Sequence, residues 1–516
     1  MGCVSSKKSK SRDIIGINPS KKICPTCKQQ YTQRGWCQPC EIKRFKDNFH
    51  NWTSGNNELD QFIRNTQINT TGPLMFLEWI PYDKFEKIKE IGKGGFGVVY
   101  KATWDLGPKM YWDDNRKTWI REGEKNIALK RIFDSNNADS HFWKELCQHR
   151  CHHNKYIPRC YGFSRDPVTR DYVIVLELVE EDLRHYLEKN NRNITWEKKL
   201  GVIYNIANGL MTIHNARLIH RNLHSGNILR HFNGSQNLTY ITDLGQYRPA
   251  SKQIKDAIDD VSVYGVLPYI APEVLYGEEY TQASDIYSFG MIMWEVSTGK
   301  RPFYERSHDV QLAEDICKGL RPSIITEVPE CYTELMEKCW NAEPRLRPNI
   351  RELEKTLMSW GWHMGVSQKH DIENQFVSAE NERLRFLELT NDNEEEEEEE
   401  ISFNGSTTCH PGAIYKSRLF KFPDLPKPQN LNEYDDIYSH KGEEKGDIKG
   451  GEGYDNDITQ INAEKIYYGE EEIKTIATNL LTDNKGFSTS FSIQQYFQSN
   501  KNNEVSLLNQ NIQDVY

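Results

Sequence analysis

Apolar positions recur with a regular period only in the middle of this chain. Two runs rich in β-branched and aromatic residues, 98–100 and 172–176, predict strands. From Trp196 onward the apolar residues recur instead at steps of three and four, which predicts a helix with one buried face. That face is formed by Leu200, Ile203, Ile206, Leu210 and Ile213. These side chains are expected to form core rather than a cofactor site.

The region from residue 361 to residue 516 lacks this periodicity. It is rich in Asn, Glu, Asp and Lys, and residues 394–400 are an unbroken acidic run. Such a stretch repels itself and buries little apolar surface, so we predict a largely disordered acidic tail. One island within it, residues 410–428, is richer in apolar and basic residues. It either docks on a partner or on this chain's own folded domain, or it is a linker.

The region before the periodic segment is mixed in character. Residues 41–84 combine Asn, Thr and Gly with apolar residues, which predicts a short helix followed by a connector over residues 46–84. Its aromatic end, residues 77–85, is expected to pack on the neighbouring domain, because an apolar run beside a domain usually does. No run of about 18 apolar residues exists, so the sequence predicts no membrane-spanning segment.

Charge is distributed unevenly along the 516 residues. The net charge is −10, but basic residues crowd the first fifty positions while acidic residues dominate the tail. This asymmetry predicts different partners at the two ends, and nothing in it indicates nucleic-acid binding.

The N-terminus, MGCVSSKKSK, fits the myristoylation pattern for Gly2, and Cys3 beside it is a candidate for palmitoylation. One myristoyl chain binds a bilayer only marginally, so a second signal is needed. Cys3 and the basic residues 7–12 both provide one. Residues 1–20 are therefore predicted to hold the protein at the inner leaflet, peripheral at the cytoplasmic face of a membrane. The alternative is a basic leader in which Gly2 and Cys3 occur by chance.

Two Cys-x-x-Cys pairs follow within residues 21–45. Four thiolates at this spacing suit a tetrahedral structural Zn²⁺, with each pair in a tight turn, a short hairpin around Gly35 and Trp36 as the local packing residue. Redox pairs and unliganded thiols are the alternatives, although acylation would place the cysteines where thiols stay reduced. The four cysteines are Cys24, Cys27, Cys37 and Cys40.

A set of ordered motifs occupies residues 85–360. They are a glycine-rich loop at 91–102, IALK at 127–130, FWKEL at 142–146, HRNLHSGN at 220–227, DLG at 243–245, APE at 271–273, SDIYSFG at 284–290 and RLRP at 345–348. In this order they resemble a protein kinase domain, most closely of the tyrosine-kinase-like group. The resemblance implies an α+β bilobal fold with a small β-rich N-lobe and a larger helical C-lobe. It also implies that Asp285 and Arg347 anchor the large lobe, with Glu273 as the partner of Arg347, and that residues 103–126 form an extended hairpin.

The same resemblance implies ATP and Mg²⁺ as cofactors. Lys130 would pair with Glu145, and Asn227 and Asp243 would hold Mg²⁺. Leu176 would be the gatekeeper beside the hinge. The residues implied to contact the nucleotide are Ile91, Gly92, Gly94, Gly97, Val99, Ala128, Lys130, Glu177, Val179, Asn227, Leu229 and Asp243.

The catalytic loop departs from the family at Asn222, where kinases carry the Asp that accepts the substrate hydroxyl's proton. An amide has nearly the same shape but no usable basicity. His224 and Val266 depart nearby, from a lysine and a threonine that serine/threonine kinases often carry. Two functions remain: a kinase that transfers the γ-phosphoryl of ATP slowly to protein Ser, Thr or Tyr hydroxyls in membrane-proximal signalling, or a pseudokinase that acts as an ATP-binding scaffold for signalling partners.

Two further predictions concern regulation. Ser262 and Tyr264 lie in the implied activation loop and are candidates for phosphorylation, with Arg221 placed to receive the phosphate.

The start of the chain also resembles that of dually acylated Src-type kinases. A third function, in which the cysteine module and the tail act while the kinase fold is an inert support, is disfavoured by the intact phosphate-binding set.

Overall fold

The computed structural model describes residues 23–431 with gaps at 34, 96, 136–153, 180, 191–192, 234–235, 244–247, 250–262, 325–326, 364–370, 392–408 and 423. The predicted leader at residues 1–20, Glu145 and Ser262 lie outside the described residues. The chain divides into two compact units, and every site discussed below lies in the larger one, residues 1–359 with 374–430. The smaller unit joins residues 360–373 to 431–516.

A six-stranded sheet forms the N-lobe, in the order β1-β7-β8-β6-β3-β2. Its strands are antiparallel except that β1 pairs parallel with β7. The strands are β1 (Glu78–Trp79), β2 (Phe85–Lys93), β3 (Gly97–Trp104), β6 (Lys125–Ile132), β7 (Cys160–Arg165) and β8 (Tyr172–Glu177). Both predicted strand runs are confirmed, in β3 and β8.

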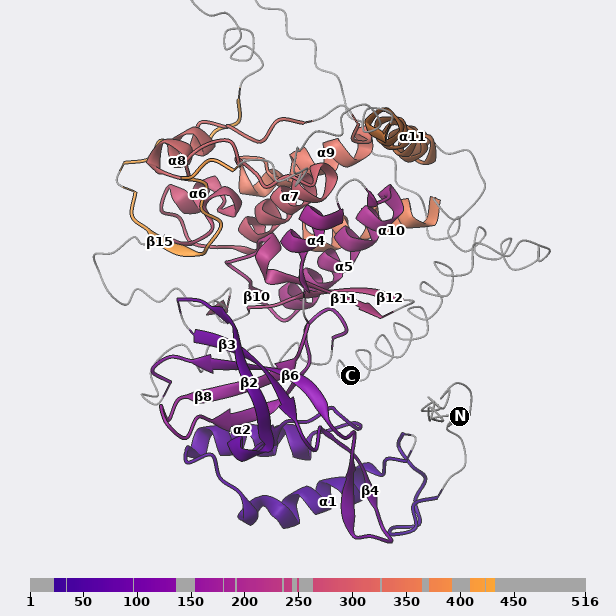
Figure 1. Cartoon of the computed structure of the whole chain (residues 1–516). Helices are drawn as coiled ribbons and strands as arrows, with labels where there is room; N and C mark the ends of the chain where they lie inside the picture. Colours follow the sequence, from indigo (N-terminus) through magenta and orange to yellow (C-terminus); the bar gives the residue numbers. More distant parts are fainter. Residues whose placement is uncertain are drawn as a thin grey trace, which may run out of the picture. The chain divides into compact units, whose positions relative to one another are not determined.

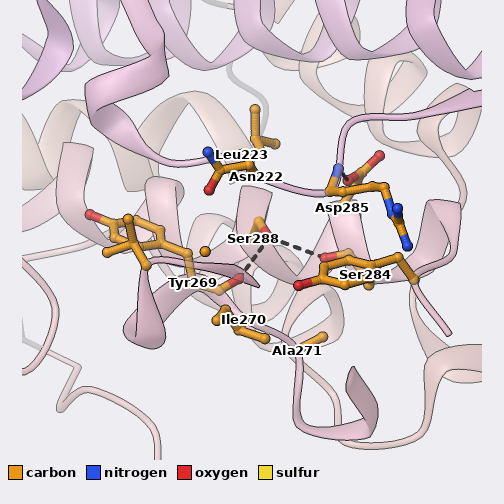
Figure 2. A pocket seen from close by; sticks show the side chains of 12 residues that line it. Asn222, Leu223, Tyr269, Ile270, Ala271, Ser284, Asp285 and Ser288 are labelled. Carbon is orange, nitrogen blue, oxygen red and sulfur yellow. Dashed lines mark hydrogen bonds between the residues drawn. The ribbon is translucent and has the colours of Figure 1, made fainter. Parts of the chain in front are cut away.

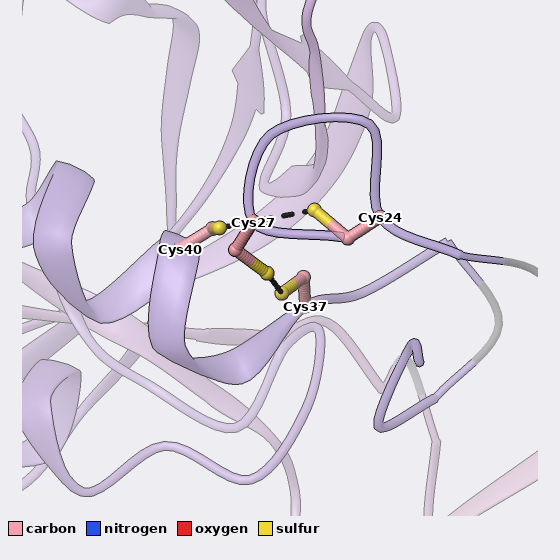
Figure 3. Close-up of side chains that lie close together, drawn as sticks. All are labelled: Cys24, Cys27, Cys37 and Cys40. Carbon is pink, nitrogen blue, oxygen red and sulfur yellow. Dashed lines mark hydrogen bonds between the residues drawn. The ribbon is translucent and has the colours of Figure 1, made fainter. Parts of the chain in front are cut away.

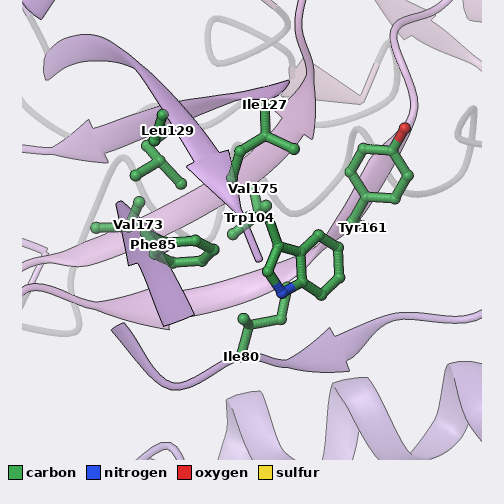
Figure 4. Close-up of a cluster of buried hydrophobic side chains, with 9 residues drawn as sticks. Ile80, Phe85, Trp104, Ile127, Leu129, Tyr161, Val173 and Val175 are labelled. Atoms are coloured by element: carbon green, nitrogen blue, oxygen red, sulfur yellow. The ribbon is translucent and has the colours of Figure 1, made fainter. Parts of the chain in front are cut away.

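Both faces of this sheet are covered, which explains why β8 is apolar without alternation. Val173 and Val175 point into one core with Phe85 and Trp104 (Figure 4). Tyr172 and Ile174 point to the other side, where Leu59 and Ile63 of helix α2 (Asn57–Ile68) pack. The aromatic run at 77–85 packs on the lobe as predicted, because Leu77, Ile80 and Phe85 are all buried in these two cores.

The region before the sheet differs from its prediction as a helix and a connector. Helix α1 (Gln38–Asn48) already begins inside the predicted cysteine module, and α2 fills much of the predicted connector. The Asn56 side chain accepts hydrogen bonds from the backbone N–H groups of Glu58 and Leu59, which caps the start of α2. The predicted hairpin in residues 103–126 is confirmed as β4 (Lys109–Asp113) paired with β5 (Thr118–Arg121).

Helices dominate the C-lobe, as predicted (Figure 1). The predicted amphipathic helix is α5 (Trp196–Asn215), capped by Thr195. The other helices are α4 (Leu183–Asn190), α6 (Pro272–Leu275), α7 (Gln282–Thr298), α8 (Val310–Cys317), α9 (Glu330–Cys339), α10 (Ile350–His363) and α11 (Asp371–Asn391). The short strands are β9 (Glu181–Asp182), β10 (Leu218–Ile219), β11 (Ile228–Asn233), β12 (Gln236–Ile241), β13 (Arg248–Pro249), β14 (Val263–Gly265) and β15 (Arg418–Phe420). Within the described ranges, no helix has the length and apolar character needed to cross a bilayer.

Two parts of the predicted disordered tail are ordered and lie in the larger unit. Phe376 of α11 is buried and packs edge-on against Trp196 at 5.8 Å. Residues 409–430 run beside α8 and α6 and contribute β15 (Figure 1). Of the alternatives for the island at 410–428, the structure shows docking on this chain's own domain.

Candidate active site

The loop 220–227 lies between β10 and β11. Asp285, in the first turn of α7, anchors it by hydrogen bonds. The Asp285 carboxylate accepts hydrogen bonds from the backbone N–H groups of His220 at 2.7 Å and Arg221 at 2.9 Å. It also lies 2.9 Å from His214 Nε2. These contacts hold Arg221 at φ +71°, a left-handed conformation that costs free energy in a non-glycine residue.

The remaining large-lobe anchor is also as predicted. Arg347 donates bidentate hydrogen bonds to Glu273 at 2.7 and 2.6 Å, and both side chains are buried. Figure 2 shows Asn222 and Leu223 above a small cavity that Tyr269, Ile270 and Ala271 close from the other side. The cavity volume is about 10 Å³, which is room for about one water. The loop therefore rests on packed C-lobe structure.

We call Lys130, Asn227 and Asp243 the nucleotide side of the site. Lys130 Nζ of β6 lies 2.8 Å from Asp243 Oδ1, just after β12. Burial raises the pKa of the Asp243 carboxyl, but the nearby Lys130 ammonium outweighs it and lowers that pKa to about 2. Asn227 Nδ2 donates to the backbone O of Asn222 at 2.8 Å and lies 3.5 Å from Asp243 Oδ2. An ionised carboxylate beside an amide oxygen is the hard-oxygen set that suits Mg²⁺.

The glycine-rich loop joins β2 to β3. A Cβ at Gly92 or Gly94 would meet no protein atom within 4 Å, whereas one at Gly97 would lie 2.3 Å from the backbone O of Arg131. Packing of β3 on β6 therefore requires glycine only at Gly97. The open space at Gly92 and Gly94 fits a loop that a phosphate chain approaches closely.

The predicted adenine-contact residues come from neighbouring strands. Val99 lies opposite Lys130 across β3 and β6, and Ala128 lies opposite Leu176 across β6 and β8. Glu177 ends β8, and Val179 follows it as a buried residue. The structure places Ile91 at the exposed end of β2 and Leu229 half-buried in β11. Glu145, the predicted partner of Lys130, is outside the described part of the chain.

We call Asn222, His224 and Val266 the acceptor side. Asn222 is 4% exposed, and its Nδ2 lies 3.5 Å from Asp243 Oδ2, so the two sides meet at this side chain. Its other neighbour is Ser417, whose Oγ lies 3.1 Å from Asn222 Nδ2 and 3.2 Å from Asn222 Oδ1. Sequence reasoning missed Ser417 as a site residue. The only signal for it was the apolar and basic character of residues 410–428.

His224 completes the contacts of Ser417, with Nε2 at 3.3 Å from the Ser417 hydroxyl. Burial, and after it the nearby Arg184 guanidinium, lowers the pKa of His224 to about 3. The ring is therefore neutral near pH 7. Its Nδ1 accepts a hydrogen bond from the backbone N–H of Gly226 at 3.1 Å, so its single proton is on Nε2 and faces Ser417. In this tautomer His224 donates to the hydroxyl and cannot take its proton.

Tyr264, one of the two predicted phosphorylation candidates, lies in β14 and is half-buried. Its backbone O accepts a hydrogen bond from the Tyr280 hydroxyl at 2.8 Å. Its own hydroxyl lies 3.2 Å from where a Cβ of Gly95 would stand, beneath the glycine-rich loop. Burial, and after it Asp243, raises the pKa of Tyr264. Arg221, the predicted phosphate receiver, lies over the Tyr280 ring at 4.5 Å.

The four cysteines form a second candidate site (Figure 3). Their sulfurs all lie within 4.8 Å of one another, with Cys24 and Cys40 at 3.8 Å and Cys27 and Cys37 at 3.4 Å. Zn–S bonds of about 2.3 Å in a tetrahedron separate sulfurs by about 3.8 Å, so the cluster could bind zinc. The second pair opens helix α1, with Cys37 as its N-cap, instead of forming the predicted tight turn.

Trp36 is the packing residue predicted for this module, but its partners lie outside the module. It is fully buried and stacks on Phe76 at 5.9 Å, beside Trp119 of the β5 hairpin at 6.1 Å. Arg44 of α1 pairs with Asp114 of the hairpin at 2.9 Å. The cysteine cluster is therefore part of an enlarged N-lobe, and residues 21–45 are not packed separately.

Comparison with known proteins agrees with this geometry. A family model described as protein tyrosine and serine/threonine kinase matches residues 85–357, more than half of the chain. A protein of Acanthamoeba polyphaga mimivirus, named as a serine/threonine-protein kinase/receptor, is 31% identical over 287 residues, 54% of this chain and 16% of that protein. Cyclic GMP-binding protein C of Dictyostelium discoideum is 29% identical over 286 residues, 52% of this chain and 11% of its own length.

A third relative is roco5 of Dictyostelium discoideum, also named as a serine/threonine-protein kinase. It is 28% identical over 319 residues, which are 58% of this chain and 10% of that protein. The chain thus spans between 10% and 16% of the length of these relatives. The matched region contains the bilobal fold, the glycine-rich loop, the catalytic loop and their anchors, and the chain belongs to the protein tyrosine and serine/threonine kinase family.

Proposed function

We propose that this protein binds Mg²⁺ATP and transfers its γ-phosphoryl group slowly to protein hydroxyls. The observation that carries this is the meeting of an intact nucleotide side with an altered acceptor side at one side chain, Asn222, 3.5 Å from Asp243. Lys130 and Asp243 retain the charges needed at the phosphates. Phosphoryl transfer relies chiefly on positioning and charge neutralisation, so losing the base slows it without removing it.

The residues divide the work as follows. Lys130 would orient the phosphates, and Asn227 and Asp243 would hold a Mg²⁺ ion, whose charge would offset that of the phosphate oxygens. The acceptor hydroxyl is oriented by Asn222 Oδ1, which accepts its hydrogen bond but does not remove its proton. General-base assistance raises the rate of the chemical step by about 10²- to 10⁴-fold. Asn222 is therefore expected to slow transfer by about this factor.

The alternative is a pseudokinase that binds ATP and acts as a signalling scaffold. One observation favours it: no base faces the acceptor from Asn222 or His224, because the first is an amide and the second directs its N–H toward the acceptor. Under this alternative the nucleotide would bias the conformation that partners recognise.

A single-turnover assay with Mg²⁺ATP and a mixed peptide pool separates the two. Wild type is compared with Asn222→Asp, and Lys130→Met serves as the blank. We expect wild type to exceed the blank and Asn222→Asp to be about 10²-fold faster or more. Wild type equal to the blank, with nucleotide binding retained, would instead establish the scaffold.

We propose further that the cysteine cluster holds one structural Zn²⁺. Its support is the fit of four sulfurs, together with the packing of Trp36, the residue before Cys37, on Phe76 and Trp119. Metal analysis of the purified protein should give one zinc per chain. Cys37→Ser should lose zinc and speed amide exchange in α1, with α7 as the internal control. Full retention of zinc by this variant would contradict the proposal.

The membrane role is proposed from the sequence of the leader alone. We propose that Gly2 is myristoylated and Cys3 palmitoylated, which holds the protein peripherally at the cytoplasmic face of a membrane. In cells given an alkynyl myristate, wild type should acquire the label and sediment with membranes. Gly2→Ala should lose both properties, and Cys3→Ser should keep the label while partitioning less. Equal partitioning of all three forms would refute this proposal.

A further inference from the structure

The segment of residues 409–431 is hydrogen-bonded to the C-lobe near its start and again near residue 430. Near its start, His410 N–H donates to the backbone O of Tyr304 at 2.8 Å, and the N–H of His308 donates to Gly412 O at 2.9 Å. Near its end, Gln429 N–H donates to the backbone O of Cys317 at 2.9 Å. These bonds hold the two ends of the segment before and at the end of α8, and its middle reaches the catalytic loop through Ser417.

Tyr415 is the main side-chain anchor of the segment. It is 5% exposed, and its hydroxyl donates to the backbone O of Pro302 at 3.0 Å. The guanidinium groups of Arg184 and Arg301 lie over its ring at 5.6 and 5.1 Å, and the His308 ring meets it edge-on at 4.8 Å. Cation–π attraction from two guanidinium groups stabilises the buried ring in this position.

The residues after Ser417 form one strand of a two-stranded sheet with the C-lobe. Strand β15 pairs antiparallel with β14, with Phe420 opposite Val263 and Arg418 opposite Gly265. Phe420 is 8% exposed, whereas Leu419 between them points outward and is 57% exposed. Burial of Phe420 fixes the register, because a slip of one residue would exchange the two faces. The pairing and the Tyr415 pocket together leave Ser417 little freedom.

Ser417 is the residue that this arrangement brings to the catalytic loop. Its Oγ touches both polar atoms of the Asn222 amide and the N–H of His224. In the kinase family the residue at the position of Asn222 receives the hydrogen bond of the acceptor hydroxyl. The Asn222 amide in turn lies 3.5 Å from Asp243, the residue placed to hold the metal ion at the phosphates. The Ser417 hydroxyl thus lies where an acceptor would.

We propose that residues 409–431 are a substrate of the domain in the same chain, and that Ser417 is its phosphate acceptor. This rests on the proposed transfer from ATP. The bond between Ser417 Oγ and the γ-phosphorus forms as the bond from that phosphorus to the β,γ-bridging oxygen breaks, and ADP leaves with the electron pair. The hydroxyl proton passes to an oxygen of the transferred phosphoryl group and then to water. His224 stays neutral throughout.

The segment also defines a substrate class for the C-lobe surface that it covers. We call this surface, which includes Arg184, Arg301 and His308, the groove. It is an extended chain with a tyrosine two positions before the acceptor serine, a phenylalanine three positions after it and basic residues Lys416 and Arg418 on either side. The aromatic residues are the buried ones, so they are expected to select the substrate more strongly than the basic ones do.

The test incubates the full-length protein with Mg²⁺ATP and then measures phosphorylation of Ser417 by peptide mass spectrometry. Wild type and Asn222→Asp should be modified there, Ser417→Thr should be modified at the same position, and Lys130→Met and Ser417→Ala should not. The rate per molecule should not change when the protein is diluted about a hundredfold, because the acceptor is tethered. A rate that falls in proportion to concentration would overturn transfer within one chain.

A matched pair tests the binding geometry. Tyr415→Ala should slow modification of Ser417 by about tenfold or more, because the hydroxyl is no longer held in place. Leu419→Ala, at an exposed position of the same segment, should not change it. A nucleotide thermal shift equal to that of wild type shows that the Tyr415→Ala domain is folded.

The remaining outcomes separate this inference from the proposed function. Phosphate on added peptides or on other residues, with Ser417 unmodified in both wild type and Asn222→Asp, would overturn the inference and leave slow transfer standing. Phosphate on no acceptor at all, even in Asn222→Asp, would overturn the proposed transfer and the acceptor role of Ser417 together. Binding of a 409–422 peptide to a Tyr415→Ala, Phe420→Ala double variant would then still report whether the groove recognises this segment.

Discussion

The nucleotide side and the acceptor side meet at Asn222, yet they differ in how far they follow the kinase family. Lys130, Asn227 and Asp243 keep the residue types that bind phosphates and Mg²⁺, and an ion pair of 2.8 Å already joins the first to the last. Asn222 carries an amide where the family carries a carboxylate, and His224 and Val266 are the two further departures that the sequence predicts beside it. The changes gather where a proton leaves the acceptor, whereas the groups that neutralise phosphate charge remain.

This difference suggests that binding and chemistry can be separated by substitution. Charge neutralisation at the phosphates supports both nucleotide affinity and the transition state, so its loss affects both. Loss of the base affects the transition state alone. The predictions below test that division, beginning with the largest effect.

Removing a charge from the nucleotide side should have the largest consequence. Asp243→Asn is expected to lower transfer by about 10³-fold or more, because the metal-binding carboxylate is lost. Nucleotide affinity, measured by calorimetry, should lose its dependence on Mg²⁺. Asp83→Asn, at an exposed position, serves as the control. If Asp243→Asn still binds Mg²⁺ATP as wild type does, the nucleotide side has been assigned to the wrong residues.

Removing Asp285, which anchors the catalytic loop, should weaken both the nucleotide side and the acceptor side. Asp285→Ala leaves two backbone N–H groups and His214 without their acceptor, which should cost about 3 kcal/mol of unfolding free energy, the lower end for breaking a buried pair. Urea unfolding measures the loss. Nucleotide affinity and transfer should fall in parallel in the folded fraction. A variant that loses only one of them would show that the two sides do not share this support.

Releasing the docked segment should change the acceptor side alone. Phe420→Ala is expected to raise phosphorylation of an added peptide by about tenfold, because β15 loses its buried side chain and the groove opens. Nucleotide affinity should stay constant. Leu419→Ala is the matched control on the exposed face of the same strand. Equal rates for both variants would argue that the segment does not compete with outside substrates.

The smallest effect concerns pH. The pKa of His224 is lowered to about 3 in the folded protein, so below the unfolded value of about 6.5 the unfolded chain binds a proton that the folded chain does not. Stability is therefore lost as pH falls from about 6.5 toward 3. Between pH 6.5 and 5.5 this amounts to about 1 kcal/mol.

The variant His224→Asn should remove that part of the pH dependence. Urea unfolding at both pH values measures it as the difference between wild type and variant, which cancels the contributions of His220 and the other groups common to both. An unchanged slope would mean that His224 binds its proton at about the same pH in the folded and unfolded chain, and could then act as a charged donor beside the acceptor at the lower pH.

Features decided by local pattern could be predicted from the sequence. The β8 run and the α5 face follow from periodicity within a few residues, and both are confirmed. The hairpin expected between two N-lobe strands in residues 103–126 is confirmed at 109–121. The anchors at Asp285 and Arg347 came from motif resemblance. Helix α2 was missed because polar residues weakened its apolar pattern. Its signals were Asn56, which suits an N-cap, and the buried residues Leu59 and Ile63, which are four positions apart.

Features decided by contacts far apart in sequence could not be predicted. Nothing near Ser417 indicates that it meets Asn222, because the pairing of β15 with β14 and the Tyr415 pocket decide it. The second cysteine pair was likewise expected in a turn, but Pro39 and the following residues suit the first turn of a helix.

Helix α11 and the docked segment are successive parts of one chain, joined by residues 392–408. Because α11 is itself packed on α5 through Phe376, the segment stays near its groove at an effective concentration of about a millimolar, whatever the concentration of the protein. An outside competitor has to exceed that level to displace it. A single cut of the backbone between α11 and residue 409 would end this advantage, and the segment would then leave by simple dilution.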